Sequence, residues 1–243
     1  MIRSLLGVAL FPLSAALAWG AAKALAGVAL GAAEAAPFVA GGGLVAAAWL
    51  IGRTLSGESG AAGWPLRAAR WLYVLGHELT HALAAWSHGG KVFSIKVGEN
   101  GGHVDVSHSG AFVALAPYCV PFHALGVVVG YRLLLWFRPQ ARAETLFLFL
   151  IGGALAFHAL MTWESLTDVR QPDLDAAGGP IFSLAVIVAA NGLLALAALK
   201  VLFPATVDFS GAVTAAAVQA RGFWTGAWDL CVRAVRAARG GGA

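Results

Sequence analysis

Long apolar runs recur along this chain of 243 residues, and they constrain its fold more than any other feature. A helix needs about 20 apolar residues to cross a bilayer, and six runs approach or exceed that length. The sequence therefore predicts an all-α polytopic membrane protein with about six transmembrane helices. The runs cover residues 5–30, 37–51, 71–86, 111–137, 145–163 and 180–203.

The composition agrees with a membrane protein. Charged residues make up 12% of the chain, against about 25% in soluble domains. The net charge of +4 comes from scattered Arg and Lys residues, several of them beside apolar runs, so the expected partner is a lipid bilayer and not a nucleic acid. No charged start combined with a signal-peptide cleavage site precedes a soluble body, so we expect the first run to be retained. Cys119 and Cys231 form no disulfide framework or metal motif.

The run at 71–86 contains the sequence His77-Glu78-Leu79-Thr80-His81, an HExxH motif. Residues four apart stand on the same face of a helix, so His77 and His81 can bind one zinc ion. Zinc lowers the pKa of a bound water molecule to about 7, and Glu78 can accept the proton that this water loses. The pattern is typical of zinc-dependent amide hydrolysis.

HExxH also arises by chance in helices that bind nothing. Ionisable residues are costly inside a run of membrane-spanning length, however, and usually mark a functional site there. Because two histidines and a glutamate share this run, we favour metal binding over coincidence.

Residues 91–107, directly after this run, alternate apolar and polar side chains around a turn signal at 99–102. The alternation predicts a small β-hairpin. Since a sheet edge cannot face lipid, the hairpin must be covered by protein or lie at the membrane surface.

A catalytic zinc ion usually has three protein ligands and one open position, so a further ligand is expected elsewhere. A lone histidine in an apolar run is usually a packed core residue, although contact with a metal ligand is an alternative. We expect Asp168 and Asp175 to be solvated and His88 to cap a helix or be exposed. The acidic candidates are Glu164, Asp168, Asp173 and Asp175, and the remaining histidines are His88, His103, His108, His123 and His158.

With these motifs the chain resembles the site-2 protease family of intramembrane zinc metallopeptidases. The residues that carry the likeness are GHELTHALAAWSHGGKV (76–92), ALAPYCVPFHAL (114–125), AFHALMTW (156–163) and QPDLDAAGGPIFS (171–183). In that family an HExxH helix is followed by a Gly-Gly turn and a β-hairpin. The resemblance implies a zinc ion held by His77, His81 and a downstream aspartate, with Glu78 as the catalytic base.

The downstream aspartate departs from the family's Leu-Asp-Gly motif in an Asn-Pro-rich stretch. This chain has Leu174-Asp175-Ala176 and no such stretch before it. A compact bacterial branch of the family carries Gln-x-Asp-Leu, which residues 171–174 match. The likeness to that branch implies Asp173 as the third ligand, with Asp175 as the alternative.

Loop charges predict that the N-terminus lies on the inner side of the membrane. Six simple spans, however, bring residues 168–175 out at the wrong end of the HExxH helix. Either residues 164–180 fold back into the bundle, or residues 111–121 form a re-entrant segment, and the sequence leaves both open. The basic residues placed inside are Arg53, Arg67, Arg70, Arg138, Arg142 and those of the tail.

We expect one membrane-embedded domain over residues 1–243, with N-terminal helices at 1–52, a catalytic core at 65–203 and a basic, Trp-containing tail at 206–243 lying at the membrane surface. The predicted activity is hydrolysis of peptide bonds in membrane-spanning or membrane-near substrates, in a multi-pass protein of the bacterial cytoplasmic membrane. The hairpin at 91–106 is a candidate surface for pairing with an extended substrate, and regulation would come from a separate protein.

Two other functions compete with this prediction. A non-catalytic metal-binding scaffold would not need the glutamate at position 78. A small transporter is disfavoured because the chain has no paired halves.

Overall fold

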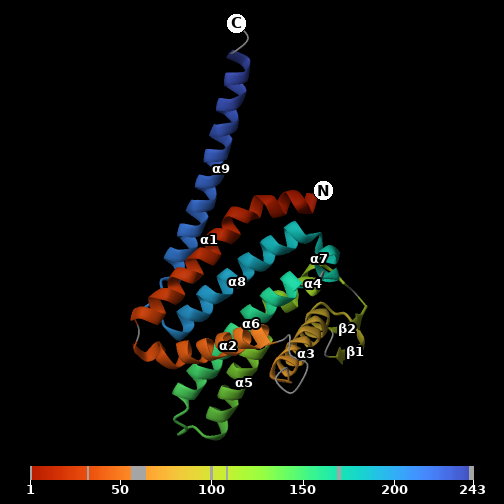
Figure 1. The fold of residues 1–243 in the computed structure, drawn as a ribbon, viewed down its shortest axis with the longest axis vertical. Coiled ribbons are helices and arrows are strands. Elements are labelled where there is room, and N and C mark those ends of the chain that lie inside the picture. The colour runs from red at the N-terminus through yellow and green to blue at the C-terminus, as the bar shows by residue number, and fades with distance from the viewer. Residues whose placement is uncertain are drawn as a thin grey trace. The chain divides into compact units, whose positions relative to one another are not determined.

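The computed structural model describes residues 2–31, 33–55, 64–98, 101–107, 109–168 and 171–240. His108, the hairpin turn at 99–100 and the side chain of Asp168 lie outside this described part. The described chain is mostly helical, with one small sheet (Figure 1). The elements are α1 (Ile2–Gly31), η1 (Ala33–Ala35), α2 (Ala36–Leu55), α3 (Trp64–Ser87), β1 (Val92–Gly98), β2 (Gly101–Val106), α4 (Ala111–Cys119), α5 (Phe122–Phe137), α6 (Glu144–Asp168), α7 (Pro172–Ala177), α8 (Pro180–Leu202) and α9 (Phe209–Gly240).

Four of the described helices, α1, α2, α6 and α8, are long and apolar enough to cross a membrane. α4 and α5 pass the same test together but are bent by 66° at their break, so they add at most a fifth span. Val120 is extended there (φ −103, ψ 115), because the following Pro121 disfavours helical backbone. The HExxH helix α3 does not pass the test, so fewer helices qualify as spans than the six predicted.

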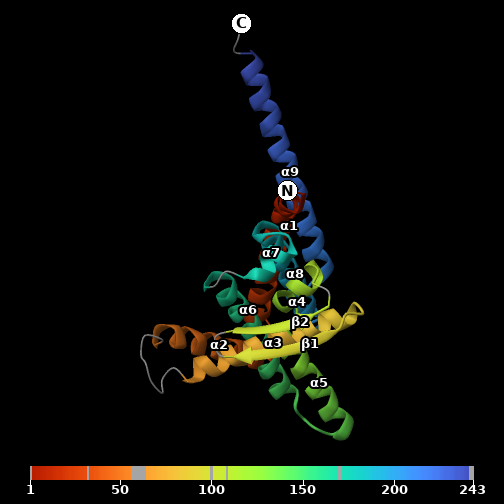
Figure 2. The same cartoon turned by 90° about the vertical axis from the view of Figure 1, so that its right-hand side faces the viewer.

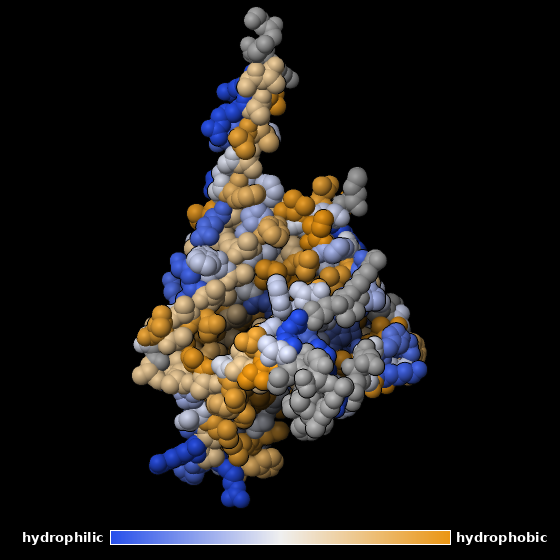
Figure 3. All heavy atoms as spheres, in the orientation of Figure 1, coloured by the Kyte–Doolittle hydropathy of each residue, from blue (hydrophilic) through white to orange (hydrophobic). Residues whose placement is uncertain are grey.

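Apolar side chains also cover the outside of these helices. Orange, hydrophobic spheres occupy much of the face visible in Figure 3. A soluble protein would bury large apolar side chains of this kind, whereas lipid contact favours their exposure. Exposed examples on the apolar helices are Phe11, Leu44, Leu133, Leu150 and Ile181.

The contacts group the chain into two compact units. The first consists of α1, α8 from Ile181 onward and α9. The Ser14 hydroxyl of α1 donates to the carbonyl of Ala185 on α8 at 2.8 Å. α9 runs antiparallel to α1, because Ala216 packs beside Leu17 and the Trp224 indole donates to the carbonyl of Ala9 at 3.2 Å. Beyond that point the large apolar side chains of α9 are exposed, and the surface location of this tail stays a prediction.

The second unit contains α2 to α7, and in it α2 and α6 run parallel. Gly152 of α6 faces Phe38, Gly153 faces Val45, and Glu164 bonds to Trp49, so the contacts advance along both helices in the same direction. At Gly152 an added Cβ would collide with the α2 backbone, which is the close approach that small residues permit between helices in lipid.

Parallel packing does not fit six alternating spans. If both α3 and residues 111–137 crossed the membrane, α2 and α6 would run in opposite directions. If only one of these two segments crosses the membrane, α2 and α6 run parallel. Glu164, near the end of α6, meets Arg70 near the start of α3, with Nε and Oε1 2.8 Å apart. The end of α6 therefore lies at the N-terminal end of α3. Residues 168–175 follow α6 directly, so they emerge at the end of α3 that six alternating spans would not have given them.

The predicted hairpin forms as β1 and β2, an antiparallel pair that lies along α3 (Figure 2). Val92 and Val106 pack against a cluster formed by Ala84 and Ala85 of α3 with Val113 and Ala116 of α4, so one face of the hairpin is covered by protein. On the exposed side, His103 Nε2 lies 2.7 Å from Asp105 Oδ1. The Ser94 hydroxyl and His103 hold the pKa of the exposed Asp105 carboxyl below its usual range.

Candidate metal centre

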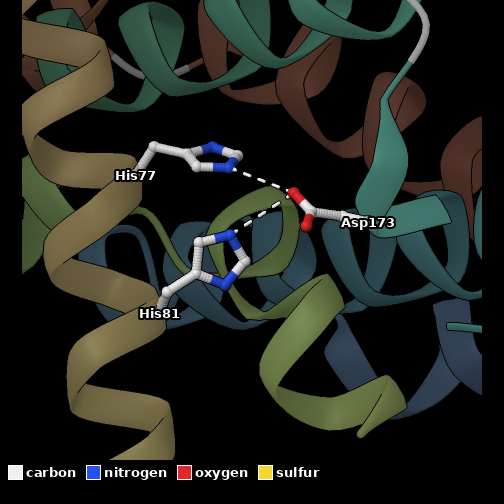
Figure 4. Close-up of side chains that lie close together, drawn as sticks. All are labelled: His77, His81 and Asp173. Carbon is white, nitrogen blue, oxygen red and sulfur yellow. Dashed lines mark ion pairs between the residues drawn. The ribbon is translucent and has the colours of Figure 1, made fainter. Parts of the chain in front are cut away.

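Two histidines and an aspartate converge between α3 and α7 (Figure 4). His77 and His81 project from adjacent turns of α3, as their four-residue spacing predicts. Oδ2 of Asp173 lies 3.5 Å from His77 Nε2 and 3.4 Å from His81 Nε2. One ligand atom from each residue falls within 4.8 Å of the other two. The structure thus brings together the three residues predicted to hold zinc.

His81 has a fixed orientation in this group. Its Nδ1 lies 2.8 Å from the carbonyl of Val113, at the start of α4. A carbonyl only accepts hydrogen bonds, so Nδ1 must carry the proton, and in the neutral ring Nε2 then points a lone pair at the Asp173 carboxylate. Two electron-rich atoms facing each other need a proton or a cation between them.

The donor set and spacing fit a zinc ion. Zinc takes imidazole nitrogen and carboxylate oxygen at about 2.0–2.2 Å in tetrahedral geometry, which places neighbouring ligand atoms roughly 3.3–3.5 Å apart. The two Nε2–Oδ2 separations match that value. Two imidazoles and one carboxylate would also leave a fourth position open, as catalytic zinc sites require.

Asp173 is held in place by the start of α7 and by Tyr118. Gln171 is extended before Pro172, which opens the helix at a position where proline is well tolerated. The fully buried Tyr118 places its hydroxyl 3.1 Å from both Asp173 Oδ2 and Gln171 Oε1. Burial of the Asp173 carboxyl opposes its ionisation, but its interactions with His77 and His81 outweigh burial and hold its pKa well below the usual range.

Glu78 lies beside the three ligands, under the hairpin. Its side chain follows His77 directly, and only 6% of the residue is exposed. A Cβ added at Gly102 of β2 would come within 2.6 Å of Glu78 Cγ and Oε1. The missing side chain at Gly102 is therefore what lets strand β2 close over the glutamate.

The three ligands and Glu78 line one cavity of about 810 Å³. Its walls come from α3, β2, the end of α6 and the start of α7, and Arg70 also lines it. The volume lies within the range of about 300–1,000 Å³ seen for ligand sites. The site therefore has room for part of an extended peptide beside the metal ligands.

The other candidate residues do not join the ligand group, although Glu164 and His103 line the same cavity. Asp175, the alternative third ligand, is exposed and outside the group. Glu164 is buried and accepts hydrogen bonds from Arg70 and Trp49. His88 approaches the Ala84 carbonyl at the end of α3, as a capping residue would. The histidines that remain, His103, His123 and His158, do not belong to the described ligand group.

The sequence did not indicate three of the residues that shape the site. Tyr118 stood out only as part of the segment 114–125 that resembles the family, Gln171 only as part of the motif around Asp173, and Gly102 only as a turn residue. Nothing in the linear pattern shows that these positions meet Asp173 and Glu78.

No model of a known protein family matches the chain, and no curated protein or solved structure matches it either.

Proposed function

We propose that the protein is an intramembrane zinc metalloprotease that hydrolyses peptide bonds of membrane-spanning or membrane-near substrates. The observation that carries this proposal is the meeting of His77, His81 and Asp173 beside Glu78 in one cavity. The resemblance to the site-2 protease family points the same way. A multi-pass location in a bacterial cytoplasmic membrane, and regulation by a separate protein, belong to the same proposal.

The chain's own residues supply binding and proton transfer. A zinc ion held by the three ligands would lower the pKa of a bound water molecule and polarise the peptide carbonyl. Glu78 takes a proton from the attacking water as its oxygen adds to the carbonyl carbon. Glu78 then delivers that proton to the leaving nitrogen as the C–N bond breaks. Tyr118 and the Val113 carbonyl orient Asp173 and His81 throughout.

Strand β2 offers a way to hold the substrate. It lines the cavity, and only one of its edges pairs with β1 in the two-stranded sheet. A helical substrate must be unwound before its amide can be attacked, and an extended segment could hydrogen-bond to the second edge of β2.

Replacing Glu78 with Gln tests the proposal. The purified Glu78→Gln protein should keep as much zinc as the native chain, measured by metal analysis, but should lose cleavage of membrane-derived peptides. Native protein without bound zinc, or a variant that cleaves at the native rate, would contradict the proposal. A metal-binding scaffold or a transporter would be indifferent to the substitution, so either alternative predicts an unchanged function.

A further inference from the structure

The cavity holds one strongly basic side chain beside the candidate metal centre. Arg70 is the one lysine or arginine among the described residues that line it, and 42% of its side chain is exposed. Arg70 precedes His77 by seven residues, which is close to two helical turns, so both project from the same face of α3. The described carboxylates that line the cavity are Glu78, Asp105, Glu164 and Asp173.

The ion pair with Glu164 is made through one nitrogen of the Arg70 guanidinium. Arg70 donates through Nε to Oε1 of Glu164 at 2.8 Å. The other oxygen, Oε2, accepts from the Trp49 indole at 2.7 Å and lies 3.9 Å from a terminal nitrogen of Arg53. Arg70 thus meets Glu164 through Nε, while the other carboxylate oxygen is occupied by Trp49.

A guanidinium held through Nε is well prepared to bind a second anion. The bond to Glu164 fixes the plane of the Arg70 side chain, and the terminal nitrogens carry the N–H groups that form a bidentate pair with a carboxylate. An incoming carboxylate would therefore meet a group that is already oriented.

The spacing along α3 gives the position of that carboxylate. Seven residues of helix span about 10 Å, and an extended peptide advances about 3.3 Å per residue. Strand β2 runs in the same direction as α3, since Gly102 lies over Glu78, whereas Ser107 bonds to Lys91, next to the Gly90 that bonds to Ala85. An extended segment along β2 that continues past Gly101 therefore heads towards Arg70, about three residues from the hydrolysed bond.

We propose that Arg70 binds a carboxylate of the substrate, about three residues from the bond that is cleaved. The carboxylate belongs to an Asp or Glu side chain or to the C-terminus of a peptide. The inference rests on the proposed peptidase function and narrows its substrates to peptides with an acidic group at that distance.

The competing interpretation is that Arg70 only ties α3 to α6 through Glu164. Arg53 provides a matched control, because it also pairs with Glu164 but does not line the cavity. In Arg70→Gln the side chain still carries a hydrogen-bond donor for Glu164, which limits damage to the fold.

The experiment measures peptide binding to the full-length, zinc-loaded Glu78→Gln protein, which cannot hydrolyse its ligand under the proposal. The probes are fluorescent, amidated ten-residue peptides of Ala and Val with one Glu or Gln at each position in turn. A further pair of ten-residue Ala/Val peptides contains no Glu. One member of this pair ends in a free carboxylate and the other in an amide. The acidic form should bind about tenfold more tightly than its neutral match at one position.

Adding Arg70→Gln should abolish this preference, whereas adding Arg53→Gln should preserve it. A preference confined to the free carboxylate assigns Arg70 to the peptide C-terminus, and one confined to Glu assigns it to a side chain. Equal affinity of acidic and neutral peptides, including no binding of either, overturns the inference. So does a preference that survives Arg70→Gln or that disappears equally with Arg53→Gln.

Cleavage separates this inference from the proposed function. Native protein should cut the preferred Glu peptide about three residues from the acidic position, as mass spectrometry of the products would reveal. If native protein prefers acidic peptides but never cleaves them, the peptidase proposal fails while the binding role of Arg70 stands.

Discussion

At the scale of single residues, the candidate metal centre depends on which carboxylate completes it. Asp173 and Asp175 are two residues apart on α7, but Asp173 faces the histidines and Asp175 is exposed. Local sequence likeness had left both open, because a short helix turns neighbouring carboxylates in different directions. Their contrast makes a matched pair of variants.

Asp173→Ala should lower zinc affinity by more than the roughly 10- to 100-fold typical of an outer contact, because it removes a ligand atom. Asp175→Ala should bind zinc as the native chain does. Competition with a chromogenic chelator measures both affinities. Equal zinc affinity in Asp173→Ala and the native protein would show that the third ligand lies elsewhere.

The hydroxyl group of Tyr118 contacts Asp173, so a single substitution can test its contribution to the metal centre. Tyr118→Phe keeps the ring, whose centroid lies 5.0 Å from that of His77, but removes the hydrogen bond to Oδ2. We expect zinc affinity to fall about 10- to 100-fold, as for other groups that orient a ligand. Tyr131→Phe is the control, because Tyr131 stacks on Phe147 away from the site. An unchanged affinity for Tyr118→Phe would leave that residue with a packing role alone.

At the scale of elements, the hairpin is the element that the local sequence pattern predicted most fully. Alternating side chains and a Gly-rich turn are local signals, and they predicted a hairpin. The structure contains it as β1 and β2, with apolar side chains packed against the helices. The HExxH spacing likewise gave the shared face of His77 and His81. The bond between Arg70 and Glu164 spans 94 positions along the chain, and no local pattern encodes such a distant pairing. For the same reason the sequence left open how residues 168–175 reach the histidines.

The second edge of β2 can be tested without disturbing the first. Ser107 donates its N–H to Lys91, so the alternation of an antiparallel ladder turns the Val104 N–H away from β1. Proline at an edge position of this kind is tolerated. Val104→Pro should therefore reduce kcat/KM for peptide cleavage by about tenfold or more at unchanged zinc content, because it removes a backbone donor and adds bulk at the edge.

Val104→Ala keeps the N–H group and serves as the control for the lost side chain. Both variants should cleave alike if the substrate does not pair with β2. Loss of zinc in Val104→Pro would instead indicate that the substitution had distorted α3.

At the scale of the whole molecule, the parallel packing of α2 and α6 changes how loop charges should be interpreted. The orientation predicted from sequence put Arg53, Arg70, Arg138 and Arg142 on one side of the membrane. In the structure the first two lie near Glu164, at the end of α6, whereas the last two precede its start. If α6 crosses the membrane, these pairs face opposite sides. The positive-inside bias can then be satisfied by only one of the two pairs.

Thiol labelling tests this arrangement directly. In a variant with Cys119 and Cys231 replaced by serine, single cysteines would be introduced by Glu34→Cys, Gln140→Cys, Thr54→Cys and Ala176→Cys. Because α2 and α6 run parallel, a membrane-impermeant maleimide added to intact cells should label positions 34 and 140 alike, and positions 54 and 176 in the opposite way. Six alternating spans would instead place 54 and 140 on the same side. Labelling of positions 54 and 140 on the same side would contradict the prediction that α2 and α6 cross the membrane in the same direction.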